Sequence, residues 1–414
     1  MRSSRLAAAL LDTAVLAAGC ASTVTGTATS AASPPVTAPD PGVPAPAAVD
    51  LHSGDLLRLA DVAATPDGGF LALLVADPGS DARTTFVRLT PGDGGLTAGA
   101  VAEAPLLDHP GELLLAPDGS VGTLGTVPPE AGDPSGDLSD GPDLVLAVLA
   151  PGAGQAEVRA VGADPELGPP ESGSGVLSAD GATLYAALRW TVDGETVTRL
   201  ATVDVATGAV TATVPLGVET PGVAHAYDLT LLPDGSVAVL VTADLDAERI
   251  AEHTLAVRFD AALRPVGAPV ELAPGEPSAG YALVALPDGT LVATVSLGID
   301  DDGGRDDTTR LVTVRDGVVQ ATADLPGSGL GLAVAPAGDR AFVTYHGDAE
   351  RGEDVAATAT VDLASGEVVD DVFLCPDGTA YENAVSADGR TVVATAACYE
   401  DGVAYTRAFL LLAG

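Results

Sequence analysis

Residues 228–241 read DLTLLPDGSVAVLV, and this stretch decides the fold. Two apolar segments flank the turn Pro233-Asp234-Gly235. Proline fixes φ, aspartate accepts a hydrogen bond from the backbone that follows it, and glycine adopts a positive φ at no steric cost. The pattern therefore predicts two antiparallel strands joined by a tight turn.

The same phrase recurs along the chain, with Pro or Ala before the turn aspartate. The seven copies occupy residues 61–75, 112–126, 175–188, 228–241, 282–295, 331–345 and 383–396. Their turn aspartates are Asp67, Asp118, Asp180, Asp234, Asp288, Asp339 and Asp388, with Asp339 displaced by one position. Successive aspartates lie roughly 50 to 62 residues apart, and units of this size with four short strands are typical of propeller blades.

Two more apolar segments follow each copy, as in RLATVDVATG (199–208) and AVTATVPLG (209–217). Each unit is therefore expected to be a four-stranded antiparallel sheet. The last unit lacks one strand, because the chain stops soon after GVAYTRAFLLL (402–412). We expect residues near 51–59 to supply that outer strand and to remove an exposed edge. The predicted fold is an all-β, seven-bladed propeller over residues 49–414.

The repeats resemble the YVTN and lactonase-like family of extracytoplasmic propellers, most closely in SADGATLYAAL (178–188) and SADGRTVVATA (386–396). This resemblance covers about residues 51–414 and implies the fold. It implies little about function, because such propellers carry unrelated activities. Lactonase-like members work with histidine and carboxylate side chains at the mouth of the central channel.

The amino terminus resembles a bacterial lipoprotein signal. Arg2 and Arg5 precede a short apolar run, and residues 16–20 read LAAGC. In that class Cys20 becomes the acylated first residue of the mature protein, anchored in the outer leaflet of the cell membrane on its extracytoplasmic side. Residues 21–48 are rich in Ser, Thr, Pro and Ala and predict a disordered linker. The absence of lysine and the single asparagine indicate GC-rich coding, as in actinobacteria.

The remaining cysteines, Cys375 and Cys398, form an even pair in an oxidising compartment, which favours a disulfide. Two buried free thiols are the alternative. The formal net charge of −40 excludes a nucleic-acid partner, because phosphates must be neutralised by cations. It favours basic partners, cations or simple solubility.

The start of the first strand in each unit places polar residues around one end of the channel, opposite the Asp-Gly turns. Convergent polar groups in a concave site are the default binding hypothesis. The alternative is a channel that is simply polar and hydrated. The candidate residues are Arg58, His109, Glu112, Glu171, His225, Tyr227, Asp228, Tyr281, Tyr381 and Glu382; Asp61 occupies the equivalent position in the first unit.

Acidic loops on the same face offer a weaker possibility, a calcium site built from Asp300, Asp302 and Asp306. The spacing of an EF-hand loop is absent, so we expect no cofactor and solvated loops.

Two functions follow. The first is a monomeric binding module, anchored to the membrane only by its lipid, that engages an envelope protein, a peptide or a glycan. The second is a lactonase- or lyase-like enzyme in which His109 and His225 act as acid and base, oriented by Glu112, Asp228 or Glu382. The sequence contains no nucleophile elbow or phosphate-binding loop, which favours the binding module.

Overall fold

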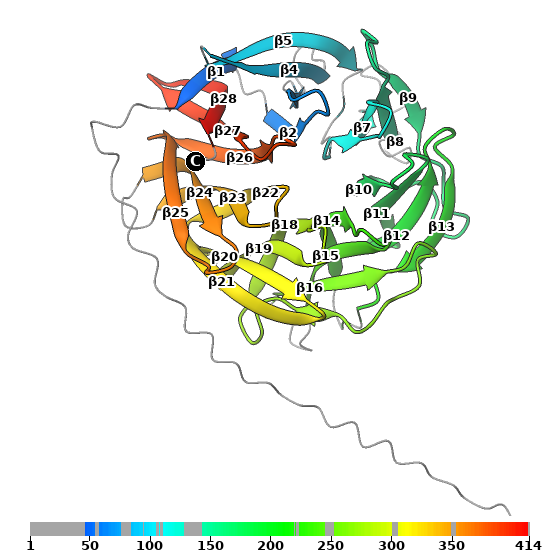
Figure 1. The fold of residues 1–414 in the computed structure, drawn as a ribbon. Coiled ribbons are helices and arrows are strands. Elements are labelled where there is room, and N and C mark those ends of the chain that lie inside the picture. Colours follow the sequence, from blue (N-terminus) through cyan, green and yellow to red (C-terminus); the bar gives the residue numbers. More distant parts are fainter. Residues whose placement is uncertain are drawn as a thin grey trace, which may run out of the picture.

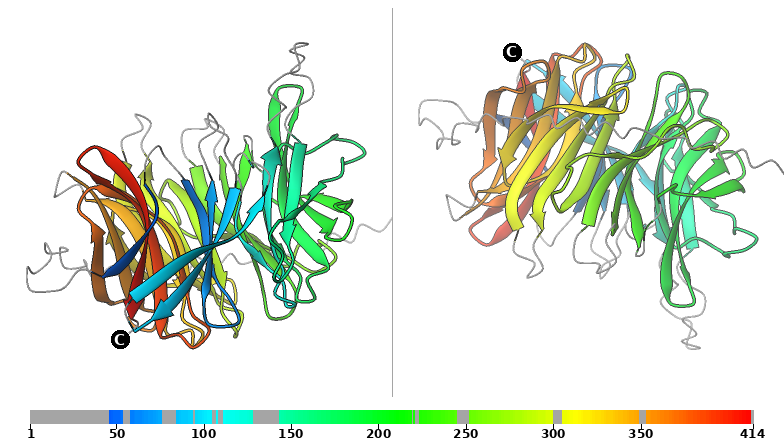
Figure 2. Two further views of the ribbon diagram at one scale, coloured as in Figure 1. Left: turned by 90° about the horizontal axis from the view of Figure 1, so that it is seen from above. Right: turned by 90° about the horizontal axis from the view of Figure 1, so that it is seen from below.

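The computed structural model describes residues 46–53, 58–75, 84–93, 95–104, 107, 111–127, 143–218, 220, 223–244, 252–299, 305–348 and 353–412. Within these ranges every regular element is a β-strand, and they form seven four-stranded antiparallel sheets arranged as blades around a ring (Figure 1). The side views show the blades standing next to one another around the ring (Figure 2). The predicted all-β, seven-bladed propeller is confirmed.

Each blade is built from consecutive strands, with the first strand innermost. Blade one contains β2 (Arg58–Ala64), β3 (Phe70–Val75), β4 (Thr84–Gly92) and β5 (Gly95–Ala104). Blade two contains β6 (Leu114–Leu115), β7 (Val121–Val127), β8 (Asp143–Leu149) and β9 (Glu157–Ala160). Blade three contains β10 (Ser172–Leu177), β11 (Thr183–Val192), β12 (Glu195–Asp204) and β13 (Val210–Pro215).

The next three blades repeat this order. Blade four contains β14 (Ala224–Leu231), β15 (Val237–Asp244), β16 (Glu252–Phe259) and β17 (Val270–Glu271). Blade five contains β18 (Ser278–Ala285), β19 (Leu291–Ile299), β20 (Arg305–Arg315) and β21 (Val318–Pro326). Blade six contains β22 (Ser328–Val334), β23 (Arg340–Asp348), β24 (Glu353–Asp362) and β25 (Val368–Cys375).

Blade seven joins the two ends of the described chain. Its strands are β26 (Gly378–Val385), β27 (Thr391–Glu400), β28 (Val403–Leu412) and, outermost, β1 (Ala47–Ser53). The ring is thus closed by an N-terminal strand, as predicted. The closing strand begins at Ala47, inside the predicted linker, and ends at Ser53, while Leu59 belongs to β2 of blade one.

The Asp-Gly turns have the predicted geometry. The turn glycines Gly68, Gly119, Gly181, Gly235, Gly289, Gly338 and Gly389 all have φ between 71° and 83°. Where the turn aspartate precedes such a glycine directly, its carboxylate accepts a hydrogen bond from the amide two residues on, as Asp118 does from Ser120 and Asp180 from Ala182. These aspartates therefore stabilise the turns, and burial of the flanking strands stabilises the hairpins.

The hydrophobic core is divided among the blade interfaces. Seven clusters of buried side chains each draw on two adjacent blades, from the cluster of blades one and two to the cluster of blades seven and one. Small aliphatic residues dominate, although the only tryptophan, Trp190, is buried between blades two and three and donates from Nε1 to the carbonyl of Gly168. Because each blade is covered on both faces, the strands are apolar on both faces.

No helix in the described part of the chain has the length and hydropathy needed to cross a membrane. Residues 1–45, which include Cys20 and nearly all of the predicted signal and linker, lie outside the described residues.

Candidate functional site

The inner strands of five blades contain a β-bulge at the same point. The pairing register shifts in β2, β14, β18, β22 and β26, which leaves Ala60, Tyr227, Tyr281, Leu330 and Tyr381 outside the regular ladder. A bulge changes the direction of its side chains, and bulges are frequent next to binding sites. The sequence placed three of these residues at the channel mouth; the bulges are the feature it did not predict.

The position seven residues before the turn glycine follows the bulge in β2, β14, β18 and β22 and lies within the irregular stretch of β26. Blades two and three have the same position without a bulge. Four blades have a carboxylate there, at Asp61, Glu112, Asp228 and Glu382, in blades one, two, four and seven. The other three blades have Ser174, Ala282 and Gly331. The fold therefore does not require an acidic residue at this position.

The two aspartates connect neighbouring blades in the same way. Asp61 accepts hydrogen bonds from the amide of Val62 at 2.6 Å and from the amide of Leu113, in blade two, at 2.5 Å. Asp228 repeats this arrangement with Leu229 at 2.6 Å and with Leu283, in blade five, at 2.5 Å. Each carboxylate thus occupies both of its oxygens with backbone donors on two blades.

The two glutamates complete one electrostatic cluster, which we call the axial carboxylates: Asp61, Glu112, Asp228 and Glu382. Glu112 forms a side-chain hydrogen bond with Asp228, two blades away. Burial and, after it, the negative charges of both aspartates raise the pKa of Glu382. Side chains from four blades therefore meet near the centre of the ring.

Burial raises the pKa of all four groups, because a low-dielectric site disfavours the charged form. Burial raises the pKa of Asp61 to about 7 and that of Asp228 to about 6, against the lowering effect of their backbone donors. Burial, followed by the charges of the aspartates, raises the pKa of Glu112 and of Glu382 well above the usual range. The raised pKa of Glu112 favours its protonated form, whose O–H is the donor in the hydrogen bond with the Asp228 carboxylate.

The other predicted mouth residues differ in what they contact. Tyr227 is 41% exposed, whereas Tyr281 and Tyr381 are half-buried. His225 is half-buried in β14, opposite Thr242 of β15. Glu171 precedes β10 and accepts a hydrogen bond from Thr191 at 2.9 Å. This contact lies within blade three and stabilises it.

Several predicted residues cannot be placed. His109, Asp300 and Asp302 lie outside the described residues, and only the backbones of Arg58 and Asp306 are described. Within the described residues, no group of three or more His, Cys, Asp or Glu side chains is arranged to hold a metal ion.

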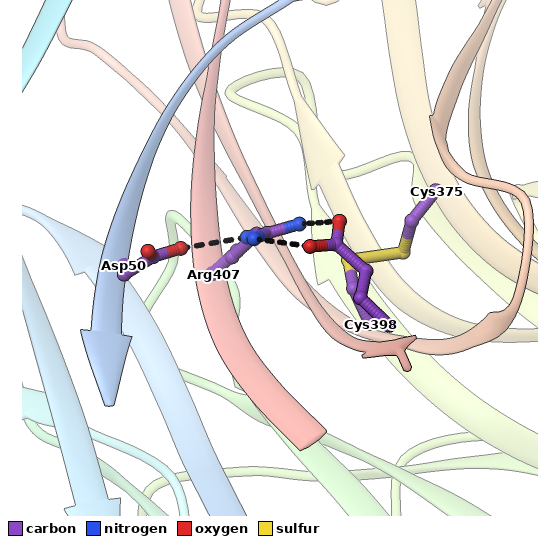
Figure 3. The surroundings of a disulfide bond; sticks show 5 residues. Asp50, Cys375, Cys398 and Arg407 are labelled. Atoms are coloured by element: carbon purple, nitrogen blue, oxygen red, sulfur yellow. Dashed lines mark hydrogen bonds and ion pairs between the residues drawn. A yellow bond between two sulfur atoms is a disulfide. The ribbon is translucent and has the colours of Figure 1, made fainter. Parts of the chain in front are cut away.

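The predicted disulfide is present between Cys375, at the end of β25, and Cys398, in β27 (Figure 3). Their Cα atoms lie 5.8 Å apart, within the usual range. The bond ties blade six to blade seven just before the segment that carries Tyr381 and Glu382. Packing beneath it is tight, since a Cβ on Gly378 would lie 2.3 Å from the carbonyl oxygen of Ala397.

Two kinds of structural contact were not predicted. At the turns, Asp67, Asp234 and Asp288 form ion pairs with arginines on the third strand of their blades, Arg88, Arg258 and Arg315. Between blades six and seven, Asn383 donates from Nδ2 to the carbonyls of Gly331 at 3.3 Å and Phe342 at 3.1 Å. Asn383 is the only asparagine in the sequence, and this rarity was the one sign by which its contact could have been noticed.

Comparison with known proteins supports the fold alone. No family model matches the chain, and no curated protein matches it. Among solved structures, hydrazine synthase from Kuenenia stuttgartiensis superposes with a TM-score of 0.56 at 16% sequence identity, covering 88% of this chain and 98% of that chain. A protein of unknown function from Dyadobacter fermentans reaches a TM-score of 0.49 at 14% identity, covering 90% and 99%.

Proposed function

We propose that this protein is a binding module, held by the lipid on Cys20 at the outer side of the cell membrane, whose axial carboxylates receive a cationic group of an envelope protein or peptide. The observation that carries the proposal is the convergence of four carboxyl groups from four blades at positions that the fold leaves free. Exposed Tyr227 lies next to Asp228 and adds an aromatic face suited to a cation.

The electrostatics favour such a ligand. Four neighbouring carboxyl groups repel one another, and protonation relieves that repulsion in the unliganded protein. A bound ammonium or guanidinium group offsets the same repulsion, and the carboxyl groups then ionise. The net charge of −40 attracts basic partners from a distance.

Site-specific photocrosslinking in the native envelope tests the proposal. A photoreactive phenylalanine replaces Tyr227, and in the matched control it replaces Tyr399, which is 39% exposed and lies at the end of β27. We expect a crosslinked partner from position 227 only, and its loss when Glu112→Gln and Glu382→Gln are added. Equal crosslinking from both positions would place the interface elsewhere.

The anchor has a separate test. Wild type should take up a palmitate label and remain with membranes, whereas Cys20→Ser should do neither. Palmitate labelling of the Cys20→Ser variant would show that Cys20 is not the acylation site.

An enzyme is the second candidate, because carboxyl groups with pKa values near neutrality are suited to acid–base chemistry. Glu112 would donate a proton and Asp228 would accept one, in place of the predicted pair His109 and His225. A lactone-hydrolysis assay tests this reading. Activity that Asp228→Asn abolishes, with a pH dependence governed by a group near 6, would support it over the binding module.

A further inference from the structure

A second surface lies between blades four and five, where a groove of about 1420 Å³ opens on the outer side of the ring. Its cause is the shortness of β17, which has two residues, whereas the outermost strands of the other blades have four to ten. After β16 the chain instead passes through Val266-Gly267-Ala268-Pro269, where proline offers no amide for a ladder. The short strand leaves the interface of the two blades incompletely covered.

The floor of the groove is apolar. Leu272, Leu291 and Val314 line it and belong to the buried cluster shared by blades four and five. At its edges Val266 is 41% exposed and Val318 is 55% exposed. An apolar floor that continues into the core, with exposed valines at the rim, has the composition of the centre of a binding interface.

The rim is acidic. Five lining residues are Asp or Glu and two are arginines. Both arginines already have acidic partners, Arg258 with Asp234 and Arg310 with Asp324 and Glu276. Asp316 is exposed at the tip of the hairpin between β20 and β21. Three of the five acids are paired with arginines in turn, and Glu271 contacts His253, so the lining keeps a net negative charge of which Asp316 is the exposed part. A positively charged ligand complements that charge.

We propose that this groove binds an extended peptide segment of a partner protein in which apolar and basic residues alternate. In an extended chain successive side chains point to opposite sides, so apolar residues reach the floor while basic residues face the acidic rim. A second copy of this chain is a poor occupant, because it carries the same charge of −40.

The groove is distinct from the axial carboxylates. Its lining includes Pro233 and Pro287, in the turns that follow the inner strands β14 and β18. Asp228, in the middle of β14, is not among the lining residues, nor are the other axial carboxylates. The two proposals can therefore succeed or fail separately.

Fluorescence anisotropy with two labelled peptides tests the inference. The probes are acetyl-(Val-Arg)4-amide and acetyl-(Ser-Arg)4-amide, which have the same charge but differ in apolar content. We expect saturable binding of the first peptide only. The double variant Val266→Ser, Val318→Ser should weaken that binding at least tenfold, whereas Val369→Ser should not, since Val369 is 50% exposed on β25 of blade six.

Each contrary outcome overturns the proposal. Equal binding of both peptides would indicate nonspecific attraction to an acidic surface. An unchanged affinity in the double variant, or an equal loss in Val369→Ser, would move the site away from the groove. A loss in Glu112→Gln, Glu382→Gln would assign the peptide to the axial carboxylates. Sedimentation showing a dimer that the double variant abolishes would make a second copy the occupant. A cooperative melting transition in each variant verifies that it folds.

Discussion

Arg407 of β28 donates from Nε to Oδ1 of Asp50 of β1 at 2.6 Å, across a sequence separation of 357 residues. The same guanidinium contacts both carboxylate oxygens of Glu400 and lies 4.8 Å from the ring centroid of Tyr405. The guanidinium therefore connects the first described strand to the last hairpin. These contacts are the polar part of the ring closure, beside the β1–β28 ladder itself.

Arg407→Gln should lower the melting temperature by about 2 °C, because a partly buried network of charges contributes more than an isolated surface pair. Differential scanning calorimetry measures the change. Arg264→Gln is the matched control, since Arg264 pairs only with Asp260, four residues away, and is 79% exposed. An equal change in melting temperature for the two substitutions would show that the Arg407 network stabilises no more than an isolated surface pair.

The disulfide should stabilise the ring measurably. Cys375→Ala with Cys398→Ala is expected to lower the free energy of unfolding by about 3 kcal/mol, the value typical for a closed loop of about this length. Denaturant unfolding gives the number. A disulfide offers no thiol to a maleimide, so the reagent should label neither residue even in denaturant unless a reductant is added first. Labelling in denaturant without reductant would show that the pair is reduced.

Asp61 and Glu382 occupy equivalent positions but should respond differently to truncation. Asp61→Ala leaves the amides of Val62 and Leu113 without their acceptor and should cost about 1–3 kcal/mol of stability. Glu382 is repelled by the charges of Asp61 and Asp228, so Glu382→Ala should lower the free energy of unfolding by less. Denaturant unfolding at pH 5, where the repulsion among the four carboxyl groups is weak, compares them. Equal losses would contradict the bridging role of Asp61.

The axial carboxylates predict a pH dependence of stability. Their pKa values are raised in the folded state, so the folded protein binds more protons than the unfolded chain between about pH 4 and 7. The stability that protonation gives is complete below about pH 4 and is lost as pH rises through about 6 and 7. The turn aspartates act in the opposite sense, because their lowered pKa values remove stability in acid.

Glu112→Gln should therefore raise the melting temperature at pH 8 by a few degrees and leave it nearly unchanged at pH 5. Glutamine still donates a hydrogen bond to Asp228 but carries no charge. Glu195→Gln, exposed at the start of β12, should change neither value. If Glu112→Gln has the same effect at both pH values, its carboxyl group does not titrate in this range.

The sequence predicted the architecture well because each blade contains its own local signal. Pro, Asp and Gly at the turns and apolar segments beside them fix four strands per unit without reference to distant residues. The count of seven followed from the repeats, and ring closure followed from the deficit at the carboxyl end. The closing strand was predicted near 51–59 and lies at 47–53, because the sequences of 47–53 and 58–64 are both compatible with a strand.

The candidate site was predicted only in part. Aligning the repeats identified Asp61, Glu112, Asp228 and Glu382 as one layer, and the structure brings the four together. The blade-bridging bonds of the aspartates depend on amides more than fifty residues away, at Leu113 and Leu283, which no local pattern indicates. The bulges at Tyr227, Tyr281 and Tyr381 and the short β17 likewise depend on tertiary packing.

Ring closure by β1 also imposes an order in time on folding. β1 and β28 are the first and last strands of the described chain, so their ladder can form only when all the strands between them are available. Until then the first six blades can assemble pairwise, but the ring stays open at blade seven. A truncated chain that ends before Val403 would consequently leave β1 without its partner and would present an unpaired edge to neighbouring chains.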